Sequence, residues 1–214
     1  MTNTITVESF AVPDSFSSGC WGGLTAIEEQ VFFGLCKHSA TDNVRLCVYN
    51  HNTQSVTELT ELQDILNQET GTIAHGKIHT QFRVLDGIAY FATHVGYYRR
   101  DRQGLKPYPG GRLIGINLET LALEDFGILH PGEGVVSIDI DSKRQQLYAM
   151  TWPNAHLVKF DLASRQSEVL GTYRLGDKGD TVCRAASIVD DTLLFCSADG
   201  TIHRLDLATG QFNQ

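Results

Sequence analysis

The feature of this sequence that most constrains its fold is a phrase that occurs four times. In each copy an apolar segment ends at Asn or Asp, and Thr or Ser follows three residues later. The Asn or Asp residues are Asn50, Asn117, Asp161 and Asp206, so the last two copies begin 44 and 45 residues after the one before. A repeat of about 40–50 residues made of short strands is typical of a β-propeller, with one four-stranded blade per repeat. The sequence therefore predicts an all-β chain with four four-stranded antiparallel blades.

The extent of each blade follows from runs of β-branched and aromatic residues that are separated by Asp-Gly, Asn and Ser breaks. The clearest strands are expected at 88–94 and 146–152. We expect one β-propeller domain over 1–214, with blades at approximately 20–59, 77–129, 133–174 and 182–214.

The sequence leaves two ring architectures open. The first is a closed four-bladed ring, in which a strand-like segment at 5–12 completes the last blade. The second is part of a larger ring, which we favour because four blades are at the small end of the propeller range. An open set of blades exposes sheet edges and apolar faces that need a partner chain. The second architecture therefore predicts a homo-oligomer.

The composition excludes several classes of partner. The chain has 214 residues, of which 42% are hydrophobic, and 17 Lys and Arg against 25 Asp and Glu give a net charge of −8. A nucleic-acid-binding surface needs the opposite balance, so we expect no nucleic acid partner. No apolar run approaches the roughly 20 residues that span a bilayer, so we expect no membrane partner. Five cysteines without a Cys-x-x-Cys spacing, and a first segment without signal-peptide character, favour a cytoplasmic protein.

Two insertions interrupt the repeat. The first, at 58–76, has a helical pattern of apolar residues near its start, and the second, at 95–110, is rich in Tyr, Arg, Gly and Pro. Loops of this length in a compact repeat fold are usually functional. Because strands alternate in direction, both insertions are expected on the propeller face where the first strand of each blade begins.

A hairpin register places two histidines on that face. Asp86-Gly87 is a strong hairpin signal that pairs Leu85 with Ile88, and continuing the same register sets His79 opposite His94. Directly opposed residues have Cβ atoms about 4.5–5.5 Å apart. Both imidazoles are therefore expected to reach one ion or one substrate oxygen.

Extending the hairpin register in the same way in the other blades predicts further polar residues near His79 and His94. It sets Glu133 opposite Trp152, Cys20 opposite Lys37, and Val182 opposite Asp199. We hypothesise that His79, His94 and Glu133 are catalytic and bind a divalent metal ion. The alternative is that they are half-exposed polar residues at strand ends that are hydrated by water.

Basic and aromatic residues near this position predict the chemistry of the ligand. Arg184 follows apolar residues, which predicts a buried arginine that needs a partner. A local basic mouth on an acidic protein suits a small anionic molecule or a peptide. The alternative is an ordinary solvated loop. The expected substrate-binding residues are Lys37, Tyr98, Arg99, Trp152, Arg184 and Asp199.

Five phrases resemble those of known proteins: Gly76-Lys77-Ile78-His79, Phe91-Ala92-Thr93-His94, Tyr108-Pro109-Gly110-Gly111, Pro131-Gly132-Glu133-Gly134 and Val182-Cys183-Arg184-Ala185. Over about 20–210 the chain resembles bacterial β-propellers of the WD40-like, YVTN-like and gluconolactonase-like kind, and it is distantly similar to streptogramin (virginiamycin B) lyases. This resemblance implies a metal-assisted lyase or hydrolase that acts on an anionic carbohydrate-like or ester substrate. The alternative that the same propellers imply is a non-catalytic scaffold that binds a protein or peptide.

Overall fold

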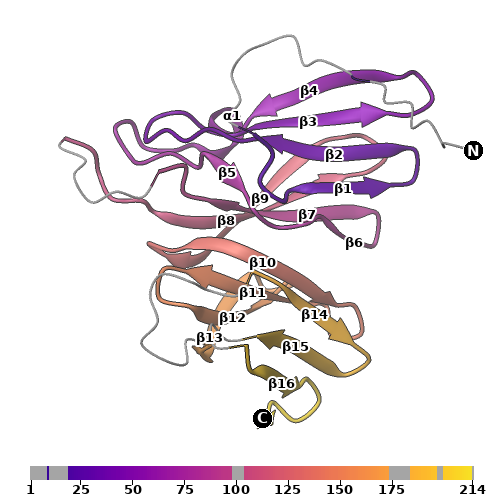
Figure 1. The fold of residues 1–214 in the computed structure, drawn as a ribbon, viewed down its shortest axis with the longest axis vertical. Helices are drawn as coiled ribbons and strands as arrows, with labels where there is room; N and C mark the ends of the chain where they lie inside the picture. Colours follow the sequence, from indigo (N-terminus) through magenta and orange to yellow (C-terminus); the bar gives the residue numbers. More distant parts are fainter. Residues whose placement is uncertain (1–8, 10–18, 98–103, 174–183, 197–199, 214) are drawn as a thin grey trace, which may run out of the picture.

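The computed structural model describes residues 9, 19–97, 104–173, 184–196 and 200–213. Within these residues the chain forms four antiparallel sheets that follow one another in sequence order (Figure 1). This arrangement confirms the predicted all-β, propeller-like fold. No helix in the described part of the chain is long and apolar enough to cross a bilayer.

The first two sheets contain nine strands and are separated by the helix. The first sheet has the order β1-β2-β3-β4, and in the second β5-β7-β8-β9 are neighbours while β6 also pairs with β7. The helix lies within the segment where a helical pattern was expected. The elements are β1 Leu24–Ile27, β2 Gln30–Leu35, β3 Arg45–Asn50, β4 Ser55–Glu61, α1 Gln63–Leu66, β5 Lys77–Ile78, β6 Arg83–Leu85, β7 Ile88–His94, β8 Gly110–Asn117 and β9 Leu123–Pro131.

The third and fourth sheets contain four strands each, again in sequence order. In Figure 1 the first and fourth sheets lie at opposite ends of the long axis, so the four described sheets form an open arc. The segment 5–12 lies outside the described residues. The strands are β10 Gly134–Asp141, β11 Gln146–Trp152, β12 His156–Asp161, β13 Gln166–Thr172, β14 Ala186–Val189, β15 Thr192–Cys196, β16 Ile202–Asp206 and β17 Phe212–Asn213.

The hydrophobic core consists of three clusters, one between each pair of successive sheets. Strand β8 contributes side chains from its two faces to two of these clusters. Ile114 and Ile116 pack against the first sheet, and Leu113 packs against the third. Since side chains alternate between the faces of a strand, this inner sheet is buried on both faces.

The repeated phrase forms the turn between the third and fourth strands of each sheet. In every copy the Asn or Asp side chain accepts a hydrogen bond from the backbone N–H three residues later, at 2.7–3.0 Å. The next residue has a positive φ in all four copies: Gln54 at 52°, Leu121 at 57°, Arg165 at 59° and Gly210 at 71°. The side-chain acceptor and the left-handed residue together close the hairpin. The repeat in the sequence therefore marks the same turn, between the third and fourth strands, in each sheet.

The predicted register holds near the Asp86-Gly87 turn and fails further out. Leu85 pairs with Ile88 as predicted, but Lys77, not His79, pairs with His94. The cause is Thr80, whose hydroxyl accepts the N–H of Ala92 at 2.9 Å, where a backbone carbonyl would be expected. This side chain replaces a ladder bond and moves the register by two residues.

The registers predicted for the other blades hold in part. Strands β1 and β2 pair as predicted, with Leu24 opposite Phe33, and β14 and β15 pair as predicted, with Val189 opposite Thr192. In the third sheet the turn lies one residue later than predicted and pairs Asp141 with Gln146, and after a bulge Gly134, not Glu133, lies opposite Trp152. Before β1, however, an isolated bridge pairs Gly19 with Cys36, whereas Cys20 was expected opposite Lys37. The predicted pairing of Val182 with Asp199 lies outside the described residues.

Candidate functional site

The imidazole rings of His79 and His94 meet even though the two residues are not paired in the sheet. Their ring centroids are 4.5 Å apart and the rings are inclined at 77°. His79 Nδ1 donates to the carbonyl of Trp21 at 3.1 Å, and His94 Nδ1 donates to the carbonyl of Val95 at 2.9 Å. Because each Nδ1 carries the proton, each Nε2 is an acceptor.

Burial and nearby cations keep both rings neutral. Burial, together with repulsion from His79, Lys77 and Arg184, lowers the pKa of His94 to about 3. Burial also lowers the pKa of His79 to about 4, with additional repulsion from Arg184 and Lys77. At neutral pH the pair therefore offers polar, uncharged groups beside two positive charges.

Lys77 and Arg184 give this region its charge. Lys77 is only 3% exposed, and its Nζ lies 5.1 Å from the centroid of the Trp21 ring, a cation–π arrangement. Burial lowers the pKa of the Lys77 amine. Arg184 is exposed, which corrects the expectation of a buried arginine. It lies two residues before β14 and lines the same pocket as Lys77.

A cavity of about 110 Å³ lies over these groups, and we call it the central pocket. A larger cavity of about 440 Å³ shares Trp21, His79 and Arg184 with it. The Trp152 ring lies 5.8 Å from that of His94. The central pocket is thus cationic and aromatic and continues into a wider opening. Its lining residues are Trp21, His38, Lys77, His79, His94, Trp152 and Arg184.

The structure brings some of the predicted site residues together and separates others. His79, His94, Trp152 and Arg184 line the central pocket. Lys37 does not line it, and Lys77 takes the place expected for a lysine there. Tyr98, Arg99 and Asp199 lie outside the described residues. Lys77 lies two residues before His79, and the observed register pairs it with His94, which places it at the pocket.

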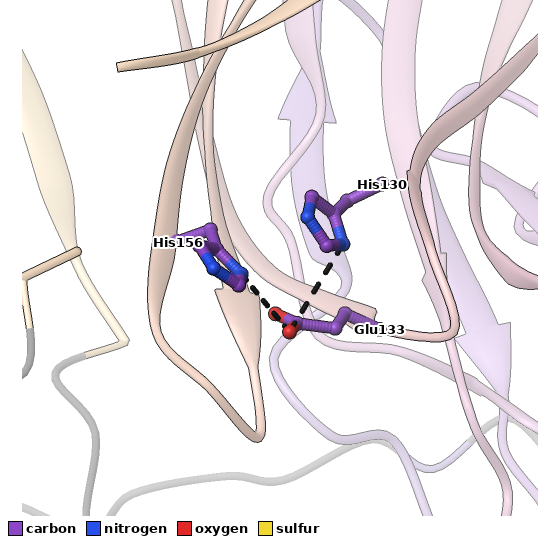
Figure 2. Close-up of side chains that lie close together, drawn as sticks. All are labelled: His130, Glu133 and His156. Atoms are coloured by element: carbon purple, nitrogen blue, oxygen red, sulfur yellow. Dashed lines mark hydrogen bonds and ion pairs between the residues drawn. The ribbon is translucent and has the colours of Figure 1, made fainter. Parts of the chain in front are cut away.

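Glu133 belongs to a second cluster (Figure 2). Its Oε1 accepts hydrogen bonds from Asn154 Nδ2 at 2.6 Å and from His156 Nδ1 at 2.9 Å, and its Oε2 accepts one from the Thr151 hydroxyl. His130 Nδ1 lies 4.0 Å from the same Oε1. Burial opposes ionisation of this carboxyl, but the hydrogen bonds outweigh burial and hold the pKa of Glu133 below its usual value.

Two turns bring this cluster together. His130 lies near the end of β9, Glu133 lies just before β10, and His156 begins β12. In the described part of the chain, these are the three residues whose ligand atoms all lie within 4.8 Å of one another, close enough to share an ion. His130 and His156 could not be predicted from the register of one hairpin, because they come from different blades. The spacing His130-Pro131-Gly132-Glu133 across a turn was the available signal.

Comparison with known proteins supports the fold. No protein-family model matches the chain, and no curated protein matches its sequence. The chain resembles a solved chain of the nidogen/laminin complex, with a TM-score of 0.52 and 13% identity over 87% of this chain. It spans 58% of that chain.

Two further solved structures are similar. The computationally designed Ika4 protein matches with a TM-score of 0.54 and 11% identity, covering 94% of this chain and 98% of Ika4. The extracellular domain of a putative one-component system from B. thetaiotaomicron matches with a TM-score of 0.56 and 13% identity, covering 89% of this chain and 21% of that one. At these identities the likeness shows the fold alone, a β-propeller-like arrangement of antiparallel sheets.

Proposed function

We propose that the central pocket binds a small anionic molecule with a carboxylate and a flat or sugar-like face, such as a uronate. The observation that carries this proposal is the position of Lys77 and Arg184 beside two neutral imidazoles, in a chain whose net charge is −8. A local cluster of positive charge on an acidic protein attracts an anion to one place. Trp21 and Trp152 supply apolar surface, and the imidazoles supply polar groups that orient a ligand.

A metal-assisted lyase or hydrolase, as the resemblance to streptogramin lyases implies, is the second candidate for the same face. The paired imidazoles, each with an unprotonated Nε2, favour it because they can accept a proton. A general base is most effective when its pKa is near the working pH, however, and the values of about 3 and 4 lie well below it. Lys77 and Arg184 would also repel a divalent ion held by His79 and His94. Binding without catalysis therefore agrees better with the charges.

Isothermal titration calorimetry of the full chain tests the proposal, with glucuronate as the probe and glucose as the uncharged control. We expect saturable binding of glucuronate and none of glucose. Arg184→Gln should weaken binding about tenfold or more, because a charge-assisted hydrogen bond is lost. Arg204→Gln is the matched control, since Arg204 is an exposed arginine of β16 outside the pocket, and it should bind like the native chain.

Three other outcomes would replace this proposal. Equal binding of glucose and glucuronate would show that charge does not select the ligand. Loss of glucuronate during incubation would indicate the lyase or hydrolase. Saturable binding of an acidic peptide with no binding of either sugar would indicate the peptide-binding scaffold.

We also propose a cytoplasmic location. The five cysteines have no Cys-x-x-Cys spacing, and among the described ones Cys20 and Cys47 are free thiols, as a reducing compartment favours. Fractionation of cells that express the chain tests this location. Recovery of the protein outside the cytoplasm would contradict it.

A further inference from the structure

We propose that His130, Glu133 and His156 form a binding site for a divalent transition-metal ion, separate from the central pocket. Two imidazoles and one carboxylate are a set that proteins use for zinc and for ferrous iron, with coordination positions left open for water or a ligand. This proposal concerns other residues than the central pocket and does not depend on what that pocket binds.

The distances in this cluster suit a metal of that size. Ligands at about 2.0–2.1 Å from a tetrahedral zinc ion lie roughly 3.4 Å from one another. In the structure Glu133 Oε1 lies 2.9 Å from His156 Nδ1 and 4.0 Å from His130 Nδ1. The two separations bracket the required value, and rotation of the two rings would bring both nitrogen atoms to that distance from Oε1. The ion would take the place of two protons, the one that His156 Nδ1 donates to Glu133 Oε1 and the one that His130 Nδ1 donates to the Pro131 carbonyl at 3.0 Å. Each ring would then carry its proton on Nε2.

The carboxylate is held in position by groups that would not compete for the metal. Asn154 Nδ2 donates to Oε1, and the Thr151 hydroxyl donates to Oε2. The same hydroxyl accepts the backbone N–H of His156 at 3.1 Å, so one side chain fixes both the carboxylate and the start of β12. Such outer groups orient metal ligands and raise affinity. Glu133 therefore meets an incoming ion with little reorganisation.

Charge and access also favour a cation here, in contrast to the central pocket. The hydrogen-bond and ion-pair partners of Glu133 in the described structure are His130, Thr151, Asn154 and His156, none of them a lysine or arginine. The side chains of His130 and His156 are 18% and 29% exposed, whereas that of Glu133 is 3% exposed. The carboxylate is thus sheltered from water while the imidazoles remain reachable from solvent.

The rings of His130 and His156 face each other across this opening. Their centroids are 4.4 Å apart and the rings are nearly parallel, at 18°. Figure 2 shows both rings on the same side of the Glu133 carboxylate. Because imidazole binds a metal through the in-plane lone pair of a ring nitrogen, an ion would lie at the Nδ1 edges of the two rings, beside Glu133 Oε1, and not between the ring faces.

Titration of the metal-free full chain with Zn²⁺, followed by calorimetry, tests this site, and Co²⁺ absorption reports the ligand geometry. We expect one Zn²⁺ per chain, and visible bands of tetrahedral Co²⁺ that zinc abolishes. Glu133→Gln and His156→Ala should each weaken binding about 100-fold or more, and Thr151→Val about 10- to 100-fold. Circular dichroism should show that each variant is folded, and His130→Ala provides a second ligand variant if one is not.

Two controls make the result specific. His51→Ala removes an exposed histidine from a turn of the first sheet and should bind Zn²⁺ like the native chain. The double variant with His79→Ala and His94→Ala should also keep its binding. No saturable Zn²⁺ binding by the native chain would overturn the proposal. Binding that is lost in the double variant but kept in His156→Ala would overturn it as well and return the metal to the central pocket.

Discussion

His79 and His94 place their rings 4.5 Å apart although the sheet pairs His94 with Lys77. The Thr80 hydroxyl makes this possible because it accepts the hydrogen bond of the Ala92 N–H. The chain between β5 and β6 then leaves the ladder, and His79 turns toward His94. One interrupted strand thus brings a lysine and two histidines to one pocket.

Thr80→Val should destabilise the protein and disturb this pocket. The substitution keeps the shape of the side chain but leaves the buried N–H of Ala92 without its acceptor, which costs about 1–3 kcal/mol of unfolding free energy. Urea unfolding measures the loss. Thr57→Val, at an exposed position of β4, is the control and should change stability by less than about 0.5 kcal/mol. Equal effects of the two substitutions would contradict the role of Thr80.

Stability should fall in mild acid because three histidines are neutral in the folded protein. Burial lowers the pKa of His75 and of His94 to about 3, and that of His79 to about 4. Below their ordinary pKa of about 6.5 the unfolded chain binds protons that the folded chain does not. Each histidine then removes up to about 1.4 kcal/mol of stability per pH unit, until the pH reaches its folded pKa.

Urea unfolding between pH 7.5 and 4.5 checks this dependence. The unfolding free energy should be level above about pH 7 and should decline below about pH 6. A folded variant with His94→Gln should show a shallower decline than the native chain. A native stability that stays constant down to pH 4.5 would show that these rings are protonated at little cost.

Asn117→Ala should loosen one hairpin of the second sheet. The Asn117 side chain accepts the N–H groups of Glu119 and Thr120 at 3.0 and 2.9 Å. Their loss at an exposed turn should cost about 1 kcal/mol. Asn117→Asp keeps both acceptor bonds, as Asp161 and Asp206 do in the later copies, and should restore most of the stability in thermal unfolding. A larger loss for Asn117→Asp than for Asn117→Ala would contradict this role of the turn.

The outer faces of the arc should cause association of two copies. Inner sheets are buried on both faces, whereas Leu24 on the first sheet is 55% exposed, and Val189 and Ile202 on the fourth are 55% and 62% exposed. Stacking the fourth sheet of one copy on the first sheet of another would repeat the packing already present between successive sheets. We expect sedimentation to give a dimer, and Ile202→Lys to weaken it.

Val169→Lys is the matched control for association, because Val169 is 49% exposed on β13 of the third sheet, away from the two outer faces. It should leave the dimer intact. A native chain that sediments as a monomer at all concentrations would contradict the expectation.

The fold could be predicted from the sequence because the turn phrase and the alternation of apolar residues are both local. Strands β7 and β11 begin and end where the pattern places them, at 88–94 and 146–152. The pairing of β5 with β7 could not be predicted, because the replacement of a backbone acceptor by the Thr80 hydroxyl leaves no mark on the hydrophobic pattern. His79 and His94 were therefore found by an argument whose pairing was wrong.

The second cluster could not be predicted for a different reason. Glu133 was expected beside His79. Instead, Asn154 and His156, which follow β11, donate hydrogen bonds to its carboxylate. Only the three-dimensional path of the β11–β12 turn brings them there. Counting residues along one hairpin cannot anticipate a contact that depends on two turns.

Tryptophan fluorescence tests the central claim, an anion in the central pocket, most directly. The chain contains two tryptophans, Trp21 and Trp152, and both line this pocket. Titration with glucuronate should change their emission saturably, glucose should not, and Arg184→Gln should shift the midpoint about tenfold or more. An emission that glucuronate leaves unchanged, or that glucose changes equally, would contradict the proposed function.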